Sequence, residues 1–328
     1  MIGYVIRRIL WMIPLVWAAA TITFFLMHLV PGGPFDQEKQ LPPAAIANLE
    51  ERYNLDEPLL EQYGLYLWDL VHGDLGISFR QDREVTDILI DGVGVSAQLG
   101  LVAFAFAMVV GMTLGVFSAL NQNNFLDYVG VFFATVGAAM PNFVAATLLV
   151  LIFSVQLGWF DVLGWGGPDN WEFWKPWSPN FWNFFNPFAW DFRKVVLPAL
   201  SLGLLPAAYI ARITRASMLE VLRQDYIRTA RSKGVREHVV VLRHAVKNAM
   251  IPVLTVAGPI FAILVTGSFI VERIFQINGV GRPFVDAVFR RDYGVIMGTT
   301  VFYATVVAMA NLVVDLLYAA VDPRIRYR

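Results

Sequence analysis

Six long apolar stretches constrain this chain more than any other feature of its sequence. Each has about the length that a helix needs to cross the hydrocarbon core of a bilayer, roughly 20 residues. The stretches lie near residues 9–30, 96–120, 128–157, 195–213, 250–270 and 295–320. Because backbone groups in lipid must pair within the protein, runs of this length predict helices. We therefore expect an all-α, polytopic membrane protein with six transmembrane helices and a single membrane domain over residues 1–328.

The composition excludes several other classes of protein. Hydrophobic residues make up 57% of the chain and charged residues 16%, whereas an ordinary soluble domain has about 25% charged residues. The sequence has no cysteine, which excludes disulfides, thiolate metal sites and a cysteine nucleophile. Arg7 and Arg8 precede the first stretch, which is too long for a secretory signal and has no small-residue cleavage pattern after it. We interpret that stretch as a retained span.

Charged residues are segregated between the loops, although the formal net charge is only −1. Segment 212–247 carries nine basic residues and three acidic ones, whereas segment 31–95 carries 13 acidic and four basic ones. Lys and Arg concentrate in the cytoplasmic loops of membrane proteins. We therefore expect residues 212–249 and both termini in the cytoplasm, and residues 31–95 and 158–193 outside it. The protein would then be a multi-pass protein of the inner or plasma membrane.

Residue spacing predicts some of the packing within this arrangement. In the loop 31–95, a helical stripe predicts short external helices; its members are Leu59, Tyr63, Tyr66 and Leu70. In the second stretch, glycines at positions 100, 111 and 115 allow close packing of helices. Pro141 interrupts the third stretch, and we interpret it as a static kink in preference to a hinge of the translocation path.

The loop 158–193 is unusual because it holds seven of the ten tryptophans in the chain. Tryptophan commonly forms a belt at the level of the lipid headgroups, and we favour that interpretation. The alternative is a stacking surface for a binding-protein partner or for a substrate with apolar faces, such as a sugar.

The segment from Asp225 to Pro252 is a basic, amphipathic stretch between long apolar runs. Apolar residues recur at steps of three and four on each side of Gly234; they are Leu219, Leu222, Tyr226 and Ala230 before it, and Val235, Val239, Leu242 and Val246 after it. Glycine commonly ends a helix in the left-handed conformation. We expect a helix, a turn at Gly234 and a second helix. One interpretation is that these helices lie on anionic headgroups.

Another interpretation follows from a resemblance. The segments DYIRTARSKG and RHAVKNAMIPV resemble the signature loop of permease subunits of ATP-binding-cassette (ABC) importers, specifically their peptide and nickel branch. The Glu and first Ala of the family's general Glu-Ala-Ala motif are replaced here by Arg228 and Thr229, but the form typical of the peptide branch is closely followed. The residues after the first span, the segment FQINGVGRPFVDAV and the C-terminal DPRIRYR resemble the same family.

The resemblance implies a fold, a set of partners and a site. The fold is the type I ABC importer permease fold, and the loop would dock on an ATP-hydrolysing subunit. The residues carried over are Arg228, Thr229, Ala230, Arg231, Ser232, Lys233 and Gly234. The implied partners are a second, homologous permease subunit, two ATP-binding subunits and an extracytoplasmic substrate-binding protein. The chain would form half of a path for dipeptides and oligopeptides and would bind no cofactor, since ATP and magnesium belong to the partners.

Residue patterns that the sequence lacks also favour a transport subunit without catalytic activity. The chain has no G-x-x-x-x-G-K-[ST] loop for nucleotide phosphates. His28, His72, His238 and His244 form no pattern that predicts a metal site. Paired polar groups, which a membrane-embedded enzyme needs, are not visible, and nothing indicates a nucleic-acid partner. We therefore predict a transport subunit that is not an enzyme, with its substrate-binding residues unknown.

Two alternatives stay open. The same architecture serves oligosaccharide, glycoside or nickel import, and the tryptophan-rich loop makes a sugar ligand the main rival. An ion-coupled secondary carrier would keep several ionisable groups in mid-membrane. Only Asp315 is placed that way, and we expect it to pair with a basic residue such as Arg324 at the cytoplasmic boundary.

Overall fold

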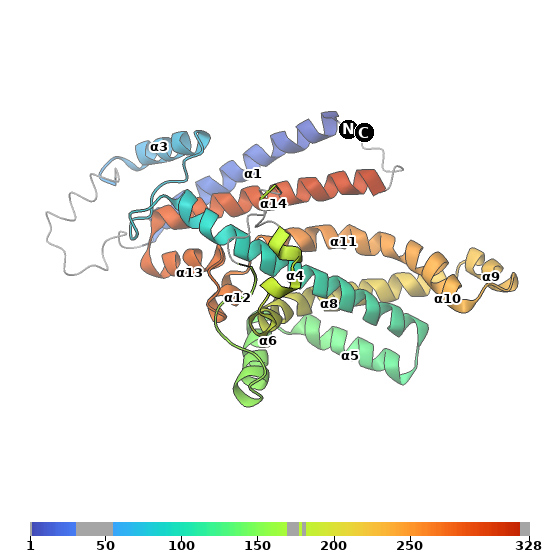
Figure 1. Cartoon of the computed structure of the whole chain (residues 1–328). Helices are drawn as coiled ribbons and strands as arrows, with labels where there is room; N and C mark the ends of the chain where they lie inside the picture. The colour runs from blue at the N-terminus through green and yellow to red at the C-terminus, as the bar shows by residue number, and fades with distance from the viewer. Residues whose placement is uncertain (1, 31–54, 169–176, 179–181, 322–328) are drawn as a thin grey trace.

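The computed structural model describes the backbone of residues 2–30, 55–168, 177–178 and 182–321, and side chains within those ranges from residue 6 to residue 313. The described part is an elongated helical bundle (Figure 1). Its helices are α1 (Ile2–Leu29), α3 (Leu59–Val71), α4 (Val85–Leu120), α5 (Phe125–Ala139), α6 (Asn142–Leu149), α8 (Phe192–Leu222), α9 (Asp225–Ser232), α10 (Glu237–Val239), α11 (Lys247–Val265), α12 (Phe269–Ile274), α13 (Gly281–Arg290) and α14 (Tyr293–Val321). Shorter π- and 3₁₀-helical segments are η1 (Val150–Gln156), η2 (Asn183–Phe185), η3 (Pro187–Ala189) and η4 (Val240–Val246).

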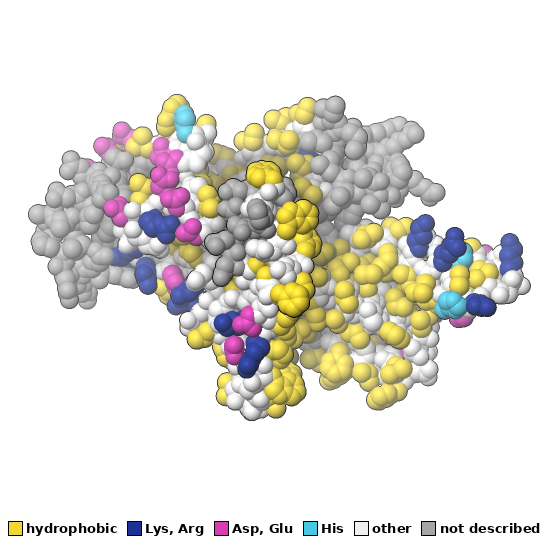
Figure 2. Space-filling view, viewed as in Figure 1, with side chains coloured by type: hydrophobic (Ala, Val, Ile, Leu, Met, Phe, Trp, Pro, Cys, Tyr) yellow, Lys and Arg dark blue, Asp and Glu magenta, His cyan; other side chains and the backbone are white. Residues whose placement is uncertain are grey.

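The number of long apolar helices fits the six predicted spans. Five described helical runs are long and apolar enough to cross a membrane, and the bent pair α5 and α6 with η1 makes a sixth if it counts as one span. The two ends of the bundle differ in what they carry. One end holds α3, α12 and α13, and we call it the α3 pole; the opposite end holds α9 and α10, and we call it the α9 pole (Figure 1). Acidic side chains gather at the α3 pole, whereas Lys and Arg dominate the α9 pole (Figure 2).

The centre of the bundle is the close contact between α4 and α8, which lie side by side. A Cβ atom at Gly111 would lie 2.7 Å from the carbonyl oxygen of Ala207, and one at Gly115 would lie 2.5 Å from the Cβ of Thr214. Gly203 of α8 makes the same kind of close contact with α4, because a Cβ there would lie 2.8 Å from the carbonyl oxygen of Ala103. The small residues therefore let the two backbones approach, and the predicted role of the α4 glycines is confirmed.

The remaining helices pack around this pair. Helix α11 lies against α4, α8 and α14, and α1 lies against α14. The helix predicted from the stripe is present as α3, and it contacts α1: the ring of Tyr66 stacks on Phe24 at 5.6 Å and the Tyr63 hydroxyl lies 2.7 Å from Thr21 Oγ1. Burial raises the pKa of the Tyr66 hydroxyl. Leu59, in contrast, is exposed.

Several helices extend beyond the predicted spans. Helix α4 begins at Val85, so it continues from the predicted span near Ser96 well into the segment predicted as loop. Helix α8 runs on to Leu222, so Arg212 and Arg215 lie on a helix and not in an irregular loop. Pro252 lies inside α11, which begins at Lys247, before the predicted start near residue 250, and continues from η4.

At Pro141 the chain bends more sharply than the predicted kink. Helices α5 and α6 meet at 110°, far beyond a proline kink. Met140 and Pro141 both have extended backbone, with ψ of 117° and 142°. A proline disfavours the helical conformation of the residue before it and donates no hydrogen bond, so the chain leaves one helix and begins another.

At the α3 pole, a buried carboxylate joins α4 to the segment that follows α11. Glu272 is 0% exposed. It accepts a hydrogen bond from Ser96 Oγ at 2.8 Å and another from the backbone N–H of Gly281 at 2.7 Å. The Ser96 hydroxyl in turn accepts from the N–H of Val280 at 2.9 Å. The predicted pairing of Asp315 with Arg324 falls outside the described side chains.

We expect opposite effects from two glycine-to-alanine substitutions. A Cβ at Gly100 would overlap the carbonyl group of Leu264, so Gly100→Ala separates α4 from α11 and costs about 1–3 kcal/mol in the free energy of unfolding. Gly64 is exposed in the middle of α3 with no atom within 4 Å of the added Cβ, so Gly64→Ala stabilises by about 0.4–1 kcal/mol. Thermal unfolding of the purified variants in detergent measures both, and a lower midpoint for Gly64→Ala would contradict the comparison.

Candidate coupling site

The seven residues predicted to contact an ATPase subunit lie at the α9 pole, on the C-terminal half of α9 and the turn that follows it. Arg228, Thr229, Arg231, Ser232, Lys233 and Gly234 are exposed, and Ala230 is half-buried. The hydroxyls of Thr229 and Ser232 bond to backbone carbonyls one turn earlier in their own helix, at 3.0 Å each. The structure therefore brings the predicted residues together on one accessible, basic surface (Figure 2).

A single side chain that the sequence analysis overlooked anchors α9. Ile227 is 0% exposed and packs in a cluster with Ala119 of α4, Met218 of α8 and Val240 of η4. Tyr226, which the predicted stripe places on the buried face, is 42% exposed. The other members of the stripe, Leu219, Leu222 and Ala230, do pack against this cluster. Tyr226 was misplaced because the chain breaks between Leu222 and Asp225 and α9 begins with a new phase.

The turn after α9 agrees with the prediction of helix, glycine and helix. Gly234 has φ of +73°, in the left-handed region that favours glycine, and a Cβ there would meet no atom within 4 Å. Its N–H bonds to the carbonyl of Arg231 at 2.9 Å. The Arg231 guanidinium spans the turn and makes two hydrogen bonds to Glu237, at 2.6 and 3.1 Å. This bond with Glu237 raises the pKa of Arg231.

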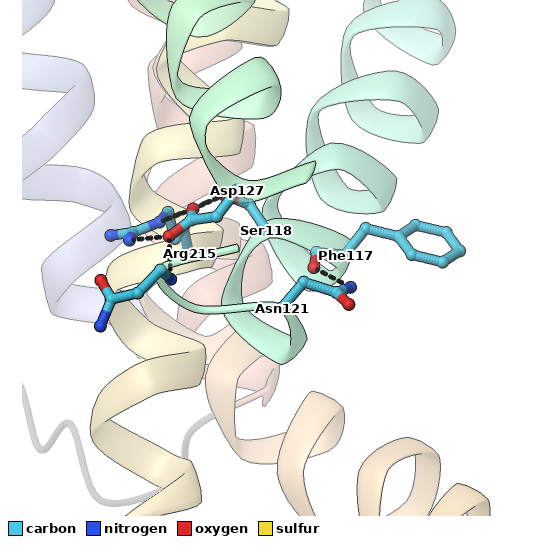
Figure 3. Close-up of polar contacts among 6 residues, drawn as sticks. Phe117, Ser118, Asn121, Asp127 and Arg215 are labelled. Carbon is cyan, nitrogen blue, oxygen red and sulfur yellow. Dashed lines mark hydrogen bonds and ion pairs between the residues drawn. The ribbon is translucent and has the colours of Figure 1, made fainter. Parts of the chain in front are cut away.

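A second polar group near this site was missed by the sequence analysis. Asp127, at the start of α5, is 2% exposed, and its carboxylate accepts two hydrogen bonds from Arg215 of α8, each at 2.7 Å. Ser118 of α4 donates to the same carboxylate (Figure 3). The sequence did carry a signal: a lone Asp at the start of one apolar stretch and an Arg just beyond the end of another. From the sequence, only Asp315 was expected to be a carboxylate within the membrane.

The tryptophan-rich segment is divided between packed and exposed side chains. Trp165 donates to Gln98 Oε1 at 2.9 Å and meets Trp190 edge to face, with ring centroids 6.0 Å apart. Trp159, Trp177 and Trp182 are exposed. Trp171 and Trp174 lie outside the described residues. The assignment of this loop to a headgroup belt or a stacking surface stays a prediction.

The described residues contain no group of three or more His, Cys, Asp or Glu side chains that would hold a metal ion. The histidines are dispersed over the fold. The ring of His28 lies beside Phe24 and Gln62, and that of His72 beside Trp68.

The anchoring of α9 is open to a direct test. Replacing Ile227 with Ala leaves a cavity in its cluster and costs about 2–5 kcal/mol, so we expect faster hydrogen exchange of the α9 amides by local opening. Thr229→Ala is the matched control, because its side chain is exposed and bonds only within α9. Equal exchange in the two variants would show that Ile227 does not hold the helix.

Comparison with known proteins agrees with this arrangement. The family described as the binding-protein-dependent transport system inner membrane component matches residues 111–327, and its N-terminal counterpart matches residues 1–100. The chain is 41% identical to the oligopeptide transport system permease protein OppB of Haemophilus influenzae, over 100% of both chains. It is also 41% identical to the dipeptide transport system permease protein DppB of Bacillus subtilis, over 99% of this chain and 98% of the relative.

Two solved structures share the fold. One is the MetNI methionine ABC transporter in inward-facing conformations, with a TM-score of 0.55 and 16% identity over 72% of this chain and 97% of that chain. The other is an amino acid ABC transporter, with a TM-score of 0.52 and 16% identity over 72% of this chain and 94% of that chain. The fold is therefore the type I permease fold of ABC importers. The chain belongs to the family of inner membrane components of binding-protein-dependent transport systems, which makes it a multi-pass membrane transport subunit and not an enzyme.

Proposed function

We propose that this chain is the permease subunit of an ABC importer for dipeptides and oligopeptides. The observation that carries the proposal is the likeness to the oligopeptide and dipeptide permeases along the whole chain. A complete importer of this kind has a second, homologous permease subunit, two ATP-binding subunits and an extracytoplasmic substrate-binding protein. This chain supplies half of the translocation path, and ATP with magnesium binds to the partners.

The surface of α9 and its turn, Arg228 to Gly234, is the proposed docking site for an ATP-binding subunit. Three features support this role. The surface is exposed, it carries three positive charges within six residues (Arg228, Arg231 and Lys233), and Ile227 fixes its base in the fold. A docking element must present its side chains outward while its backbone stays rigid, and the Arg231–Glu237 hydrogen bonds across the turn contribute to that rigidity. We place this pole in the cytoplasm and the α3 pole outside.

Transport then follows from a change between two packed states, each favoured by a ligand. ATP binding closes the pair of ATP-binding subunits and displaces α9. The displacement opens the path toward the binding protein and its cargo at the opposite pole. ATP hydrolysis and release of the products return the bundle to its first state.

The rival substrates have less support. A sugar ligand was suggested by the tryptophan-rich loop, but Trp165 and Trp190 are engaged in contacts with the protein itself. Because Trp159, Trp177 and Trp182 are exposed, direct binding measurements with sugars can test whether they form a stacking surface. If the protein were a self-contained ion-coupled carrier, this chain alone would take up its substrate. Reconstitution of this chain alone distinguishes that carrier from an ABC importer.

We expect Gly234→Trp to abolish docking and Gly234→Ala to preserve most of it. Both substitutions strain the left-handed turn, by about 1–2 kcal/mol, but a Cβ at this position meets no protein atom, so only the indole projects bulk from the surface. Affinity purification of the tagged chain from membranes, followed by identification of co-purifying proteins, measures docking. Recovery of ATP-binding subunits with the wild type and with Gly234→Ala, and their loss with Gly234→Trp, is the expected result.

The outcomes separate the site from the class of transporter. Retention of the ATP-binding subunits by Gly234→Trp would move the docking site elsewhere. If the wild type brings down no ATPase under conditions that keep membrane complexes intact, the importer itself is excluded.

For the substrate, we expect the reconstituted complex to take up a labelled tripeptide only with ATP and the binding protein. Uptake of a labelled oligosaccharide in its place would contradict the peptide assignment.

A further inference from the structure

We propose that Asp127 and Arg215 are positioning residues that transmit the displacement of α9 into the membrane-spanning helices. The inference rests on the proposed function, because it concerns how docking at α9 affects the translocation path. The ion pair ties the ends of α4, α5 and α8 nearest α9 into one rigid unit. In this role the ion pair determines the number of substrate molecules transported per ATP hydrolysed. It does not determine whether the subunits assemble.

The Asp127 carboxylate is bonded on all sides. Its Oδ1 accepts from Arg215 Nε at 2.7 Å and from Ser118 Oγ, and its Oδ2 accepts from the second Arg215 nitrogen at 2.7 Å and from the Asn123 N–H at 3.0 Å. Arg215 Nε also lies 3.2 Å from Ser118 Oγ. These contacts come from α4, α5, α8 and the turn between α4 and α5 (Figure 3). One carboxylate therefore fixes three helices and a turn.

The turn depends on this carboxylate. Asn123 has φ of +64°, an uncommon conformation for a residue other than glycine. Its N–H is held by Asp127, and the Asn121 side chain bonds to the carbonyl of Phe117 at 2.9 Å. The reversal from α4 to α5 is therefore specified by side-chain hydrogen bonds.

Side-chain packing links this unit to α9. Ile227 of α9 shares a buried cluster with Ala119 and Met218. Ala119 follows Ser118 directly, and Met218 lies three residues after Arg215 on α8. A displacement of α9 therefore acts on the two helix ends that the ion pair joins, and through Val240 it also acts on η4.

The contact between α4 and α8 in this unit has little freedom to yield. Gly115 of α4 lies against Thr214 of α8, where a Cβ would come within 2.5 Å of the threonine Cβ. Gly130 of α5 meets Ser118 in ordinary van der Waals contact beside a small hollow between the three helices, so packing constrains α5 less tightly than it constrains α8. Packed interfaces of this kind switch between discrete arrangements and do not deform gradually. Charge-assisted, bidentate hydrogen bonds add a directional constraint that apolar packing lacks.

The alternative role is purely structural. A buried ion pair is strongly destabilising to break because one charge is left unpaired. In that case any loss of transport would follow loss of assembly or of thermal stability, and the number of peptides moved per ATP would stay constant in the complexes that do assemble.

The first test measures labelled tripeptide uptake per ATP hydrolysed by the complete complex in proteoliposomes with its binding protein. We expect Asp127→Asn to lower this ratio by about tenfold, within the usual range for coupling between sites, while hydrolysis persists. Arg215→Lys and Ser118→Ala, which keep the charges, should give smaller losses in the same direction. Asp91→Asn is the control, because Asp91 makes an exposed pair with Arg83 near the other end of α4. An unchanged ratio in the assembled variants, an equal loss in the control, or failure of all three variants to assemble would overturn the proposal.

The second test does not depend on the substrate. The chain has no cysteine, so spin labels at the exposed positions Phe125→Cys on α5 and Glu220→Cys on α8 are unique within this subunit. In the otherwise wild-type complex, the distance between the labels should stay the same in the nucleotide-free and vanadate-trapped states, and it should change on trapping when Asp127→Asn is added. A change without that substitution would exclude a rigid unit. If no tripeptide is transported, the peptide assignment fails while this measurement still tests the ion pair.

Discussion

The close approach of α4 and α8 through small residues is the contact on which the rest of the bundle depends. In lipid, exposed apolar side chains gain nothing by leaving one apolar environment for another, so helix association relies on backbone proximity and tight contact. Gly111, Gly115 and Gly203 supply that proximity, and Gly100 extends it to α11. The apolar face of α5, with Phe125, Phe132 and Phe133 exposed, needs no such complementarity. Further buried apolar clusters pack around this seam.

Buried carboxylates bond to α4 at two levels, one toward each pole of the bundle. Ser96 of α4 binds Glu272 near the α3 pole, and Ser118 of the same helix binds Asp127 near the α9 pole. The two serines are 118 − 96 = 22 residues apart, or about 33 Å along a helix at 1.5 Å per residue. This separation is close to the thickness of a hydrocarbon core, about 30 Å. The spacing is compatible with one buried carboxylate near each membrane boundary, where polar groups cost least, and an apolar, tightly packed stretch of α4 between them.

The sequence predicted the features that depend on composition and local conformation. Length and apolarity located the spans, and the conformational demand at Gly234 located the turn after α9. It could not predict features that depend on partners distant in sequence. Ile227 is buried because Met218 and Val240 surround it, and the apolar stripe gave no sign of the break that shifts the phase of α9. Asp127 and Arg215 are 88 residues apart, so only the fold brings them together. The sharp bend at Pro141 lay within reach of sequence reasoning, since the restriction on Met140 is local.

The two connections of α9 to the bundle differ in their backbone hydrogen bonding. Toward its N-terminus, α9 is joined by a short break to α8, which is packed along α4 and held by Arg215. Toward its C-terminus it is joined through Gly234 and the π-helical η4 to α11. Internal prolines do not distinguish the two sides, because α8 and α11 each contain two of them. Helices commonly bend at π-helical turns, so a force on α9, acting through the docking that we propose, would bend the chain more readily at η4 than within α8.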